Sequence, residues 1–327
     1  MRIDACYFGP PQGAAEAAHS ARRAKLNGLW FPETGHDPFL AVLMASQAEP
    51  ELEVGTGIAV AFARSPMTLA QTSWDLAGLT RGKFYLGLGS QVKAHIVRRF
   101  SMPWGKPIDQ MRDMIGAVRA IWAAFESGDR LNYTSEYYQL SLLTPFFSPE
   151  KHAYGKIPVG IAAVGPKMTE LAGEVADFIA YHTFTTKQYL DTVTLPAVQA
   201  GLAKSGRPPQ ALERVGSLFV ITGDAERKRK MELAVRNQIA FYASTPAYQP
   251  VLESVGHGPL HTQLHQMSRQ GQWTEMGALI PDEVLDAFSL TADPPDLAQA
   301  IRSRFADYYD RVLIQISPED LLALGQS

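Results

Sequence analysis

The chain has 327 residues, of which 46% are hydrophobic and 19% are charged, and it contains a single cysteine. Its 30 Lys and Arg residues against 33 Asp and Glu residues give a formal net charge of −3, which argues against a nucleic-acid surface or a polybasic membrane anchor. One cysteine excludes an internal disulfide framework and a cysteine cluster for a metal. Because no run of about 18 apolar residues and no signal sequence occurs, we expect a soluble, cytoplasmic protein.

Short apolar runs, typical of strands that are buried on both faces, alternate with helical stretches along the chain. The first half contains predicted strands at 2–8, 29–32, 52–58 and 83–88, with helices at 12–27, 38–49, 66–79 and 111–127. The second half contains predicted strands at 157–163, 177–181, 215–222 and 312–316, with helices at 168–175, 187–204, 224–243 and 294–309, and a short helix after the last strand.

Eight strands that are each followed by a helix favour a closed (β/α)8 barrel over an open doubly wound sheet. The segments 130–156 and 244–290 do not fit the repeat, and we interpret them as insertions because no linker composition separates them from the rest. The sequence therefore predicts one domain over 1–327, although the length alone would allow two.

The insertion 244–290 carries His257, His261 and His265 at intervals of four residues. This spacing would permit a metal site on one helix face, but no zinc-protease motif accompanies it. We therefore expect a solvent-lined insertion and no metal. Cys6 lies in the first predicted strand, where a buried thiol is the simplest interpretation.

In a (β/α)8 barrel the active site lies at the carboxyl ends of the strands, so the polar residues that follow each strand are the candidates. Glu33 and His36 follow the second predicted strand, and His182 follows the sixth. Glu33 could equally form a salt bridge to a neighbouring basic residue. No second carboxylate is paired with it in the sequence, so a glycoside-hydrolase pair has little support.

Two further loops are suited to binding an anion. Gly87 and Gly89 let the backbone approach a ligand, and the residues that follow them add donors. The pair Gly165-Pro166 begins a predicted helix, whose first amides can bind a phosphate. Neither loop is a dinucleotide fingerprint, and each could be only a tight turn.

Five motifs in the same order along the chain resemble the bacterial-luciferase-like superfamily, and within it the deazaflavin (coenzyme F420) dependent oxidoreductases. The resemblance covers nearly the whole chain and is weakest over 244–290. The motifs are GTGI at 55–58, RSP at 64–66, GKFYLGLG at 82–89, IAAVGP at 161–166 and LAGEVAD at 171–177.

This resemblance implies a single barrel with insertions, usually a homodimer, that binds a flavin or deazaflavin at its carboxyl-end face. It also implies a non-proline cis peptide bond after the third strand, which falls at Gly57-Ile58. The residues that it places at the cofactor are Glu33, Gly57, Ile58, Val60, Gly89, Ser90, Gln91, Lys93, His95, Gly165, Pro166 and Met168.

The chain departs from the sugar-phosphate dehydrogenases of this family at two positions. Those enzymes have a histidine directly after the acidic residue, whereas here Thr34 follows Glu33 and His36 comes two positions later. Their glutamate in the loop after the fourth strand is replaced by Val92. The departures argue against a sugar-phosphate substrate and leave the substrate unidentified.

The resulting hypothesis is an oxidoreductase that transfers a hydride between coenzyme F420 and a small organic substrate. Glu33, His36 and His182 are the candidate catalytic residues, because a histidine with a near-neutral pKa could serve as an acid or a base. The histidines could instead only orient another group through a hydrogen bond. Two alternatives remain: an FMN-dependent monooxygenase that uses molecular oxygen, and a flavin-binding protein without turnover.

Overall fold

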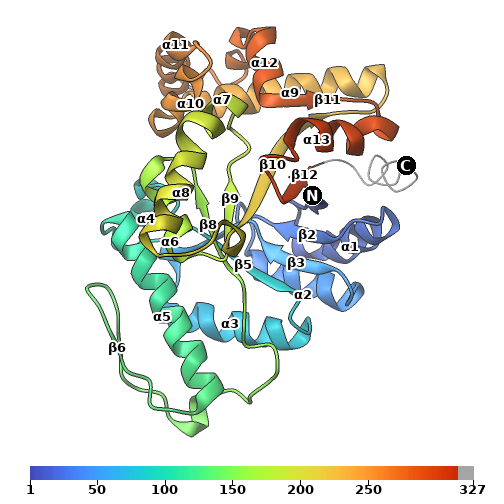
Figure 1. Ribbon diagram of the computed structural model, residues 1–327. Coiled ribbons are helices and arrows are strands. Elements are labelled where there is room, and N and C mark those ends of the chain that lie inside the picture. Colours follow the sequence, from blue (N-terminus) through green and yellow to red (C-terminus); the bar gives the residue numbers. More distant parts are fainter. Residues whose placement is uncertain (316–327) are drawn as a thin grey trace.

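Eight parallel strands close into a barrel in the computed structural model, which describes residues 1–315 (Figure 1). Neighbouring strands pair in the order β12-β1-β2-β3-β5-β8-β9, and β10 pairs with both β9 and β12 to close the ring. This confirms the predicted (β/α)8 fold. The strands are β1 (Arg2–Cys6), β2 (Gly28–Phe31), β3 (Glu53–Thr56), β5 (Phe84–Gly89), β8 (Val159–Ala163), β9 (Phe178–Tyr181), β10 (Glu213–Ile221) and β12 (Arg311–Ile314).

The predicted strands agree with these bounds within a few residues, and a two-residue strand, β4 (Ala59–Val60), adds to the edge of β5. The predicted helix over 12–27 is shorter than expected. A 3-10 turn (Pro11–Gly13) precedes α1 (Ala14–Arg23), and the chain then turns through Lys25 at a φ of 55°. Residue 316 and the short helix expected after it lie outside the described residues.

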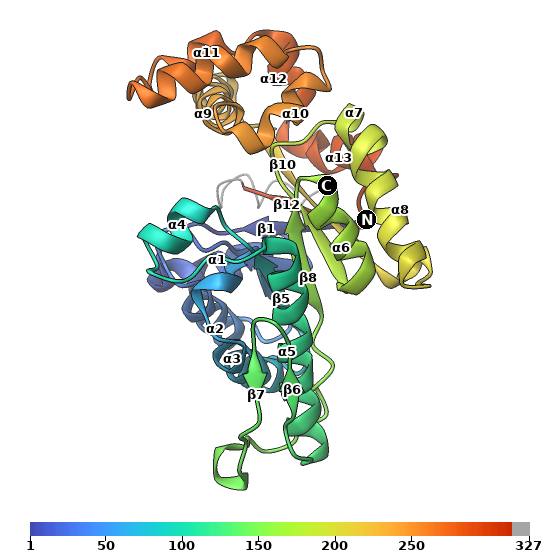
Figure 2. The same ribbon diagram turned by 90° about the vertical axis from the view of Figure 1, so that its left-hand side faces the viewer.

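The helices of the repeat surround the barrel (Figures 1 and 2). Several begin at residues that the sequence marks as helix starts: the Asp37 carboxylate accepts the Phe39 N–H, and the Ser65 hydroxyl accepts the Thr68 N–H. The remaining helices of the repeat are α2 (Pro38–Ala48), α3 (Pro66–Leu79), α4 (Lys93–Arg98), α5 (Pro107–Ser127), α6 (Pro166–Val175), α7 (Lys187–Tyr189) with a π-helical turn (Leu190–Thr194), α8 (Leu195–Lys204), α9 (Ala225–Ala243) and α13 (Leu297–Phe305).

The two insertions lie at opposite ends of the molecule (Figure 2). Segment 130–156 contains the hairpin β6 (Tyr133–Thr134) and β7 (Gln139–Leu140), which lies beside α5; the Tyr133 hydroxyl donates to the Asp113 carbonyl at 3.2 Å. Segment 244–290 forms α10 (Gln249–Glu253), α11 (Gly258–Arg269), α12 (Asp282–Phe288) and β11 (Ser289–Thr291), and it lies beyond the carboxyl ends of the strands.

The expectation of a solvent-lined 244–290 insertion is wrong. Its helices pack with α9 around a second hydrophobic cluster, and β11 extends the sheet by pairing with the end of β10. His261 is buried, and its Nδ1 lies 2.6 Å from the Ala243 carbonyl oxygen, while the Nδ1 of His265 lies 2.9 Å from that of Ser244. These histidines therefore bind the last carbonyls of α9, which a helix leaves without partners of its own.

The amino-end half of the barrel interior is filled by a charged cluster and an aromatic layer. The fully buried Arg311 guanidinium binds three carboxylates, those of Asp4, Glu53 and Glu213. The Trp30 indole N–H donates to Asp4 at 2.7 Å. The aromatic layer above the cluster consists of Trp30, Tyr85 and Phe178, with Val215, Leu313 and Cys6 beside it.

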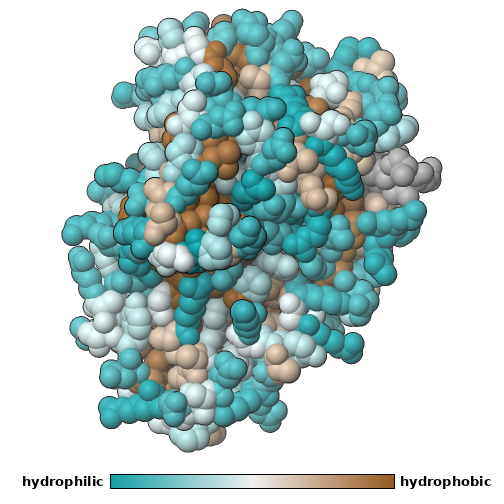
Figure 3. Space-filling model, viewed as in Figure 1, coloured by the Kyte–Doolittle hydropathy of each residue, from teal (hydrophilic) through white to brown (hydrophobic). Residues whose placement is uncertain are grey.

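Cys6 lies at the end of β1 and is partly buried, and desolvation raises the pKa of its thiol to about 12. None of the helices within residues 1–315 combines the length and the hydropathy needed to cross a membrane. The surface in Figure 3 is mostly hydrophilic, and its hydrophobic atoms form small patches among polar ones.

Candidate active site

Glu33 links the end of β2 to the segment that follows β3. Its carboxylate oxygen Oε2 accepts the Val60 N–H at 2.7 Å and an Arg64 N–H at 2.6 Å, and the side chain is only 6% exposed. Arg64 also binds Asp37 at 2.7 Å and lies over the ring of Phe39. The salt bridge that the sequence left open is therefore present, with Arg64 as the partner.

The peptide bond Gly57-Ile58 is cis, as the resemblance implies. The backbone on both sides of the bond is paired with β2: the Gly57 N–H donates to the Phe31 carbonyl, and the Glu33 N–H donates to the Ile58 carbonyl, both at 2.9 Å. Together with the Glu33 carboxylate on Val60, these bonds fix the segment 57–60 at the carboxyl end of the barrel.

The carboxyl-end half of the barrel interior is lined by small residues. Side chains alternate along a strand, so the positions two and four residues beyond the aromatic layer also face inward. A Cβ atom at Gly89 would lie 2.6 Å from the Cδ1 atom of Ile58, which places Gly89 directly against the cis segment. The small residues are Gly57, Gly87, Gly89, Ala162, Ala180 and Ser217.

The amino end of α6 is open to a ligand. At α2, α3, α7 and α9, which also begin at the carboxyl-end face, a side chain of Asp37, Ser65, Thr186 or Asp224 accepts a backbone N–H of the first turn. At α1 and α4 no side chain does so. At α6 the corresponding residue is Gly165, no side chain caps the first turn, and no atom lies within 4 Å of where a Cβ atom would stand. Pro166 and Met168 belong to this same first turn. The free amides and the helix dipole suit an anionic group.

The loop after β5 brings further donors to the same face. Gln91 has a φ of 57°, and its side-chain oxygen accepts the Val92 N–H at 3.0 Å, which turns the chain from Ser90 into α4. Lys93 and His95 lie in the first turn of α4 and are exposed. Lys93 has no ion-pair partner among residues 1–315.

The two candidate catalytic histidines lie in different environments. His36 is exposed in the loop between Glu33 and Asp37, and no hydrogen bond of its side chain occurs within residues 1–315. His182 follows β9, where its Nδ1 accepts the Phe184 N–H at 3.0 Å. Burial lowers the pKa of His182 from 6.5 to about 4, so this imidazole is neutral at physiological pH.

His182 contacts two tyrosines that sequence reasoning did not select. Its ring centroid lies 4.6 Å from that of Tyr242, at the end of α9, and 4.9 Å from that of Tyr248, in a 3-10 turn (Pro246–Tyr248). The Arg64 partnership was also missed, although Arg64 belongs to one of the motifs. No local pattern could reveal either contact, because the partners are separated by 31 residues or more.

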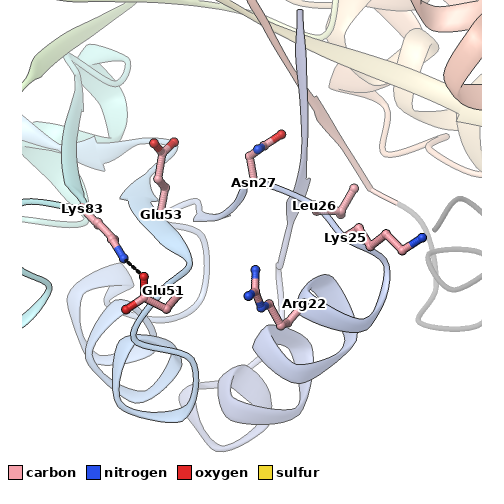
Figure 4. A pocket seen from close by; sticks show the side chains of 7 residues that line it. All are labelled: Arg22, Lys25, Leu26, Asn27, Glu51, Glu53 and Lys83. Atoms are coloured by element: carbon pink, nitrogen blue, oxygen red, sulfur yellow. Dashed lines mark hydrogen bonds and ion pairs between the residues drawn. The ribbon is translucent and has the colours of Figure 1, made fainter.

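No group of three or more His, Cys, Asp or Glu side chains within residues 1–315 is arranged to hold a metal ion. A polar hollow of about 530 Å³ lies at the opposite end of the barrel, where Arg22 reaches in from α1 and Lys83 is paired with Glu51 (Figure 4). Its residues precede or begin strands, so the hollow is not at the candidate active site.

Comparison with known proteins decides the family. The sequence profile of the luciferase-like monooxygenase family matches residues 7–311. The chain belongs to this family. It is accordingly an oxidoreductase of the luciferase-like type.

Relatives cover most of the chain. An uncharacterized protein of Mycobacterium tuberculosis is 47% identical over 96% of this chain and 92% of its own length. The 5,10-methylenetetrahydromethanopterin reductase of Methanolobus tindarius is 26% identical over 88% of this chain and 86% of its own length. Relatives that match a shorter part of the chain, 57–60% of it at 28–29% identity, include F420-dependent dehydrogenases.

Solved structures agree on the fold. The coenzyme F420 dependent tetrahydromethanopterin reductase of Methanopyrus kandleri superposes with a TM-score of 0.81 at 17% identity, over 99% of this chain and 97% of that chain. An EDTA monooxygenase from Chelativorans sp. BNC1 superposes with a TM-score of 0.73 at 12% identity, over 100% and 92%.

Proposed function

We propose that the protein is an F420-dependent oxidoreductase that transfers a hydride between the deazaflavin and a small organic substrate. The observation that carries the proposal is the uncapped amino end of α6 beside a barrel mouth lined by small residues. The names of the relatives, which include F420-dependent reductases and dehydrogenases, support the same cofactor. When bound, a deazaflavin supplies a two-electron hydride donor or acceptor that reacts poorly with oxygen.

The residues of the chain have distinct tasks in this proposal. The open first turn of α6, with Gly165, Pro166 and Met168, would bind the phosphate of the cofactor, and the loop 89–95 with Ser90, Gln91, Lys93 and His95 would contact its tail. Glu33 and Arg64 fix the segment 57–60, which would support the rings. Glu33, His36 and His182 remain the candidates for polar contact with the reacting groups.

A titration of the protein with F420, in which the fluorescence of the cofactor is measured, tests the proposal. A substitution at the N-cap of α6 then tests whether this helix binds the phosphate. Gly165→Asp places a carboxylate where the phosphate would bind. It should stabilise the fold by up to about 1 kcal/mol, as an aspartate cap does elsewhere, while it weakens F420 binding roughly tenfold or more.

Gly165→Asn is the matched control, because it can cap the helix without adding a charge. We expect it to stabilise the fold similarly and to weaken F420 binding less than Gly165→Asp does. Equal affinity of all three proteins for F420 would show that α6 does not bind the phosphate.

The same titration separates the alternatives. Micromolar binding of FMN without binding of F420 would favour the FMN-dependent monooxygenase, an activity that the fold shared with EDTA monooxygenase also accommodates. Cofactor binding without reduction by any donor would favour a flavin-binding protein without turnover.

We also propose a homodimer in which the outer face of α2 is covered by a second copy. Most of α2 is apolar, and Leu40, Leu43 and Met44 are exposed on it. A helix that is apolar all round is usually buried. The molar mass in solution, measured by light scattering, tests this: a monomer at micromolar concentration would contradict it.

A further inference from the structure

The end of β9 carries a group of polar atoms that the proposed cofactor does not use. His182, Tyr242 and Tyr248 form one aromatic group, with ring centroids between 4.6 and 5.7 Å apart. His182 directly follows β9, Tyr242 lies in the last turn of α9, and Tyr248 lies within the 244–290 segment. The group therefore lies between the carboxyl end of β9 and the 244–290 segment.

All three residues offer a neutral hydrogen-bond donor. The Nδ1 atom of His182 accepts the Phe184 N–H, so the proton of the neutral imidazole is on Nε2. Burial raises the pKa of both tyrosine hydroxyls, which keeps them protonated. Within residues 1–315 neither hydroxyl forms a hydrogen bond, and neither does the Nε2 atom of His182; all three side chains are partly exposed.

No charged side chain influences the titration of this group. Burial alone lowers the pKa of His182, and no charged side chain contributes to the shift of either tyrosine. The rings beside it, those of Phe184, Phe219 and Phe288, are apolar. Two cations of this face are engaged elsewhere: Arg64 binds two carboxylates, and Arg99 donates to the Thr34 carbonyl at 2.7 Å. Lys93, which is unpaired within residues 1–315, lies on α4, in the loop region assigned above to the cofactor tail.

We propose that His182, Tyr242 and Tyr248 form the substrate-binding wall, and that they bind an uncharged oxygen, a carbonyl or a hydroxyl group, on an apolar or aromatic substrate. The inference rests on the proposed function, because the wall selects what is presented to the cofactor. An anionic substrate is disfavoured here, since burying a charge without a counter-ion costs far more than burying a neutral oxygen that accepts a hydrogen bond.

Two probes that differ by one charged group test the inference: acetophenone and 4-acetylbenzoate. Each is titrated by calorimetry into the F420-loaded protein and into the protein without F420. We expect acetophenone to bind at least about tenfold more tightly than 4-acetylbenzoate in both forms. Equal or tighter binding of the anionic probe, or no binding of either, would overturn the proposal.

Three substitutions then locate the binding wall. Tyr242→Phe and Tyr248→Phe keep the rings and remove one hydroxyl each, so each should weaken acetophenone binding roughly threefold to tenfold, as expected for one neutral hydrogen bond. His182→Phe removes the Nε2 donor and should act in the same direction. Unchanged acetophenone affinity in all three variants would show that the wall lies elsewhere.

Tyr308→Phe is the matched control, because the Tyr308 hydroxyl donates to the exposed Asp191 and is not part of the group. It should leave acetophenone binding unchanged. The affinity for F420 should be the same in all four variants. If the unmodified protein does not bind F420, the proposed function is refuted. The preference between the two probes can still be measured in the protein without F420, so the two proposals are tested separately.

Discussion

The two ends of the barrel interior are built from different kinds of residue. The amino-end half holds a fully buried arginine with three carboxylates, under a layer of large aromatic rings. The carboxyl-end half holds glycine, alanine and serine, around a backbone segment fixed by hydrogen bonds. The first half is packed with large and charged side chains, whereas the second has small residues beside hydrogen-bond donors.

This difference separates stability from function. A buried ion cluster is strongly destabilised when one member is lost, because the remaining charges have no partner. A mouth lined by small residues contributes little to the core but admits a planar ring system. Substitutions at the amino end should therefore change the free energy of unfolding, and those at the carboxyl end should change ligand affinity.

The largest effect is expected for Arg311→Met. The substitution leaves Asp4, Glu53 and Glu213 with fewer counter-charges, so urea denaturation should show a loss of about 3–5 kcal/mol in the free energy of unfolding. F420 affinity of the folded protein should not change.

Arg2→Met provides the comparison, because Arg2 binds the same Glu53 and Glu213 but its side chain is 38% exposed. We expect a loss of at most about 1 kcal/mol. Equal losses for the two variants would contradict the assignment of the buried arginine as the centre of the cluster.

An intermediate effect is expected for Glu33→Gln, at the carboxyl end of the barrel. The amide can still accept the Val60 N–H, while Arg64 retains Asp37 but loses its buried partner. The free energy of unfolding should fall by about 1–2 kcal/mol, and F420 affinity or turnover should fall roughly tenfold as the segment 57–60 loosens.

Glu16→Gln is the control for a carboxylate, since Glu16 pairs with Arg23 on the exposed surface of α1 and should change neither quantity. A Glu33→Gln protein that binds F420 and reacts at the normal rate would remove Glu33 from both roles.

The smallest effect concerns the pH dependence of stability. The folded-state pKa of His182 is about 4, below its usual 6.5, so the unfolded chain binds more protons between these values. The contribution of His182 to stability is therefore complete above pH 6.5 and is lost as the pH falls toward 4. The His182 contribution to the free energy of unfolding, measured with urea, should be about 1 kcal/mol smaller at pH 5.5 than at pH 7. His182→Phe should abolish this pH-dependent contribution. An identical pH profile in the variant would contradict the buried neutral state.

Local signals predicted the elements well. Proline in the first helical turn agrees with the predicted start of α3 at Pro66, and apolar runs predicted all eight barrel strands. The cis bond at Gly57-Ile58 followed from the family resemblance, not from any local rule. The 244–290 segment was misjudged, because its buried face forms only against α9, which a local pattern does not show.

Sequence alone determined the barrel and placed Gly165 and Glu33 after the ends of its strands, at the face of the candidate site, because strand and helix periodicity depends on near neighbours. Only the tertiary structure decided that Arg64 binds Glu33, that α6 is left without a cap and that two tyrosines meet His182. These contacts join residues far apart in the chain, and their distances, burial and protonation depend on how the barrel closes and how the insertion packs onto it.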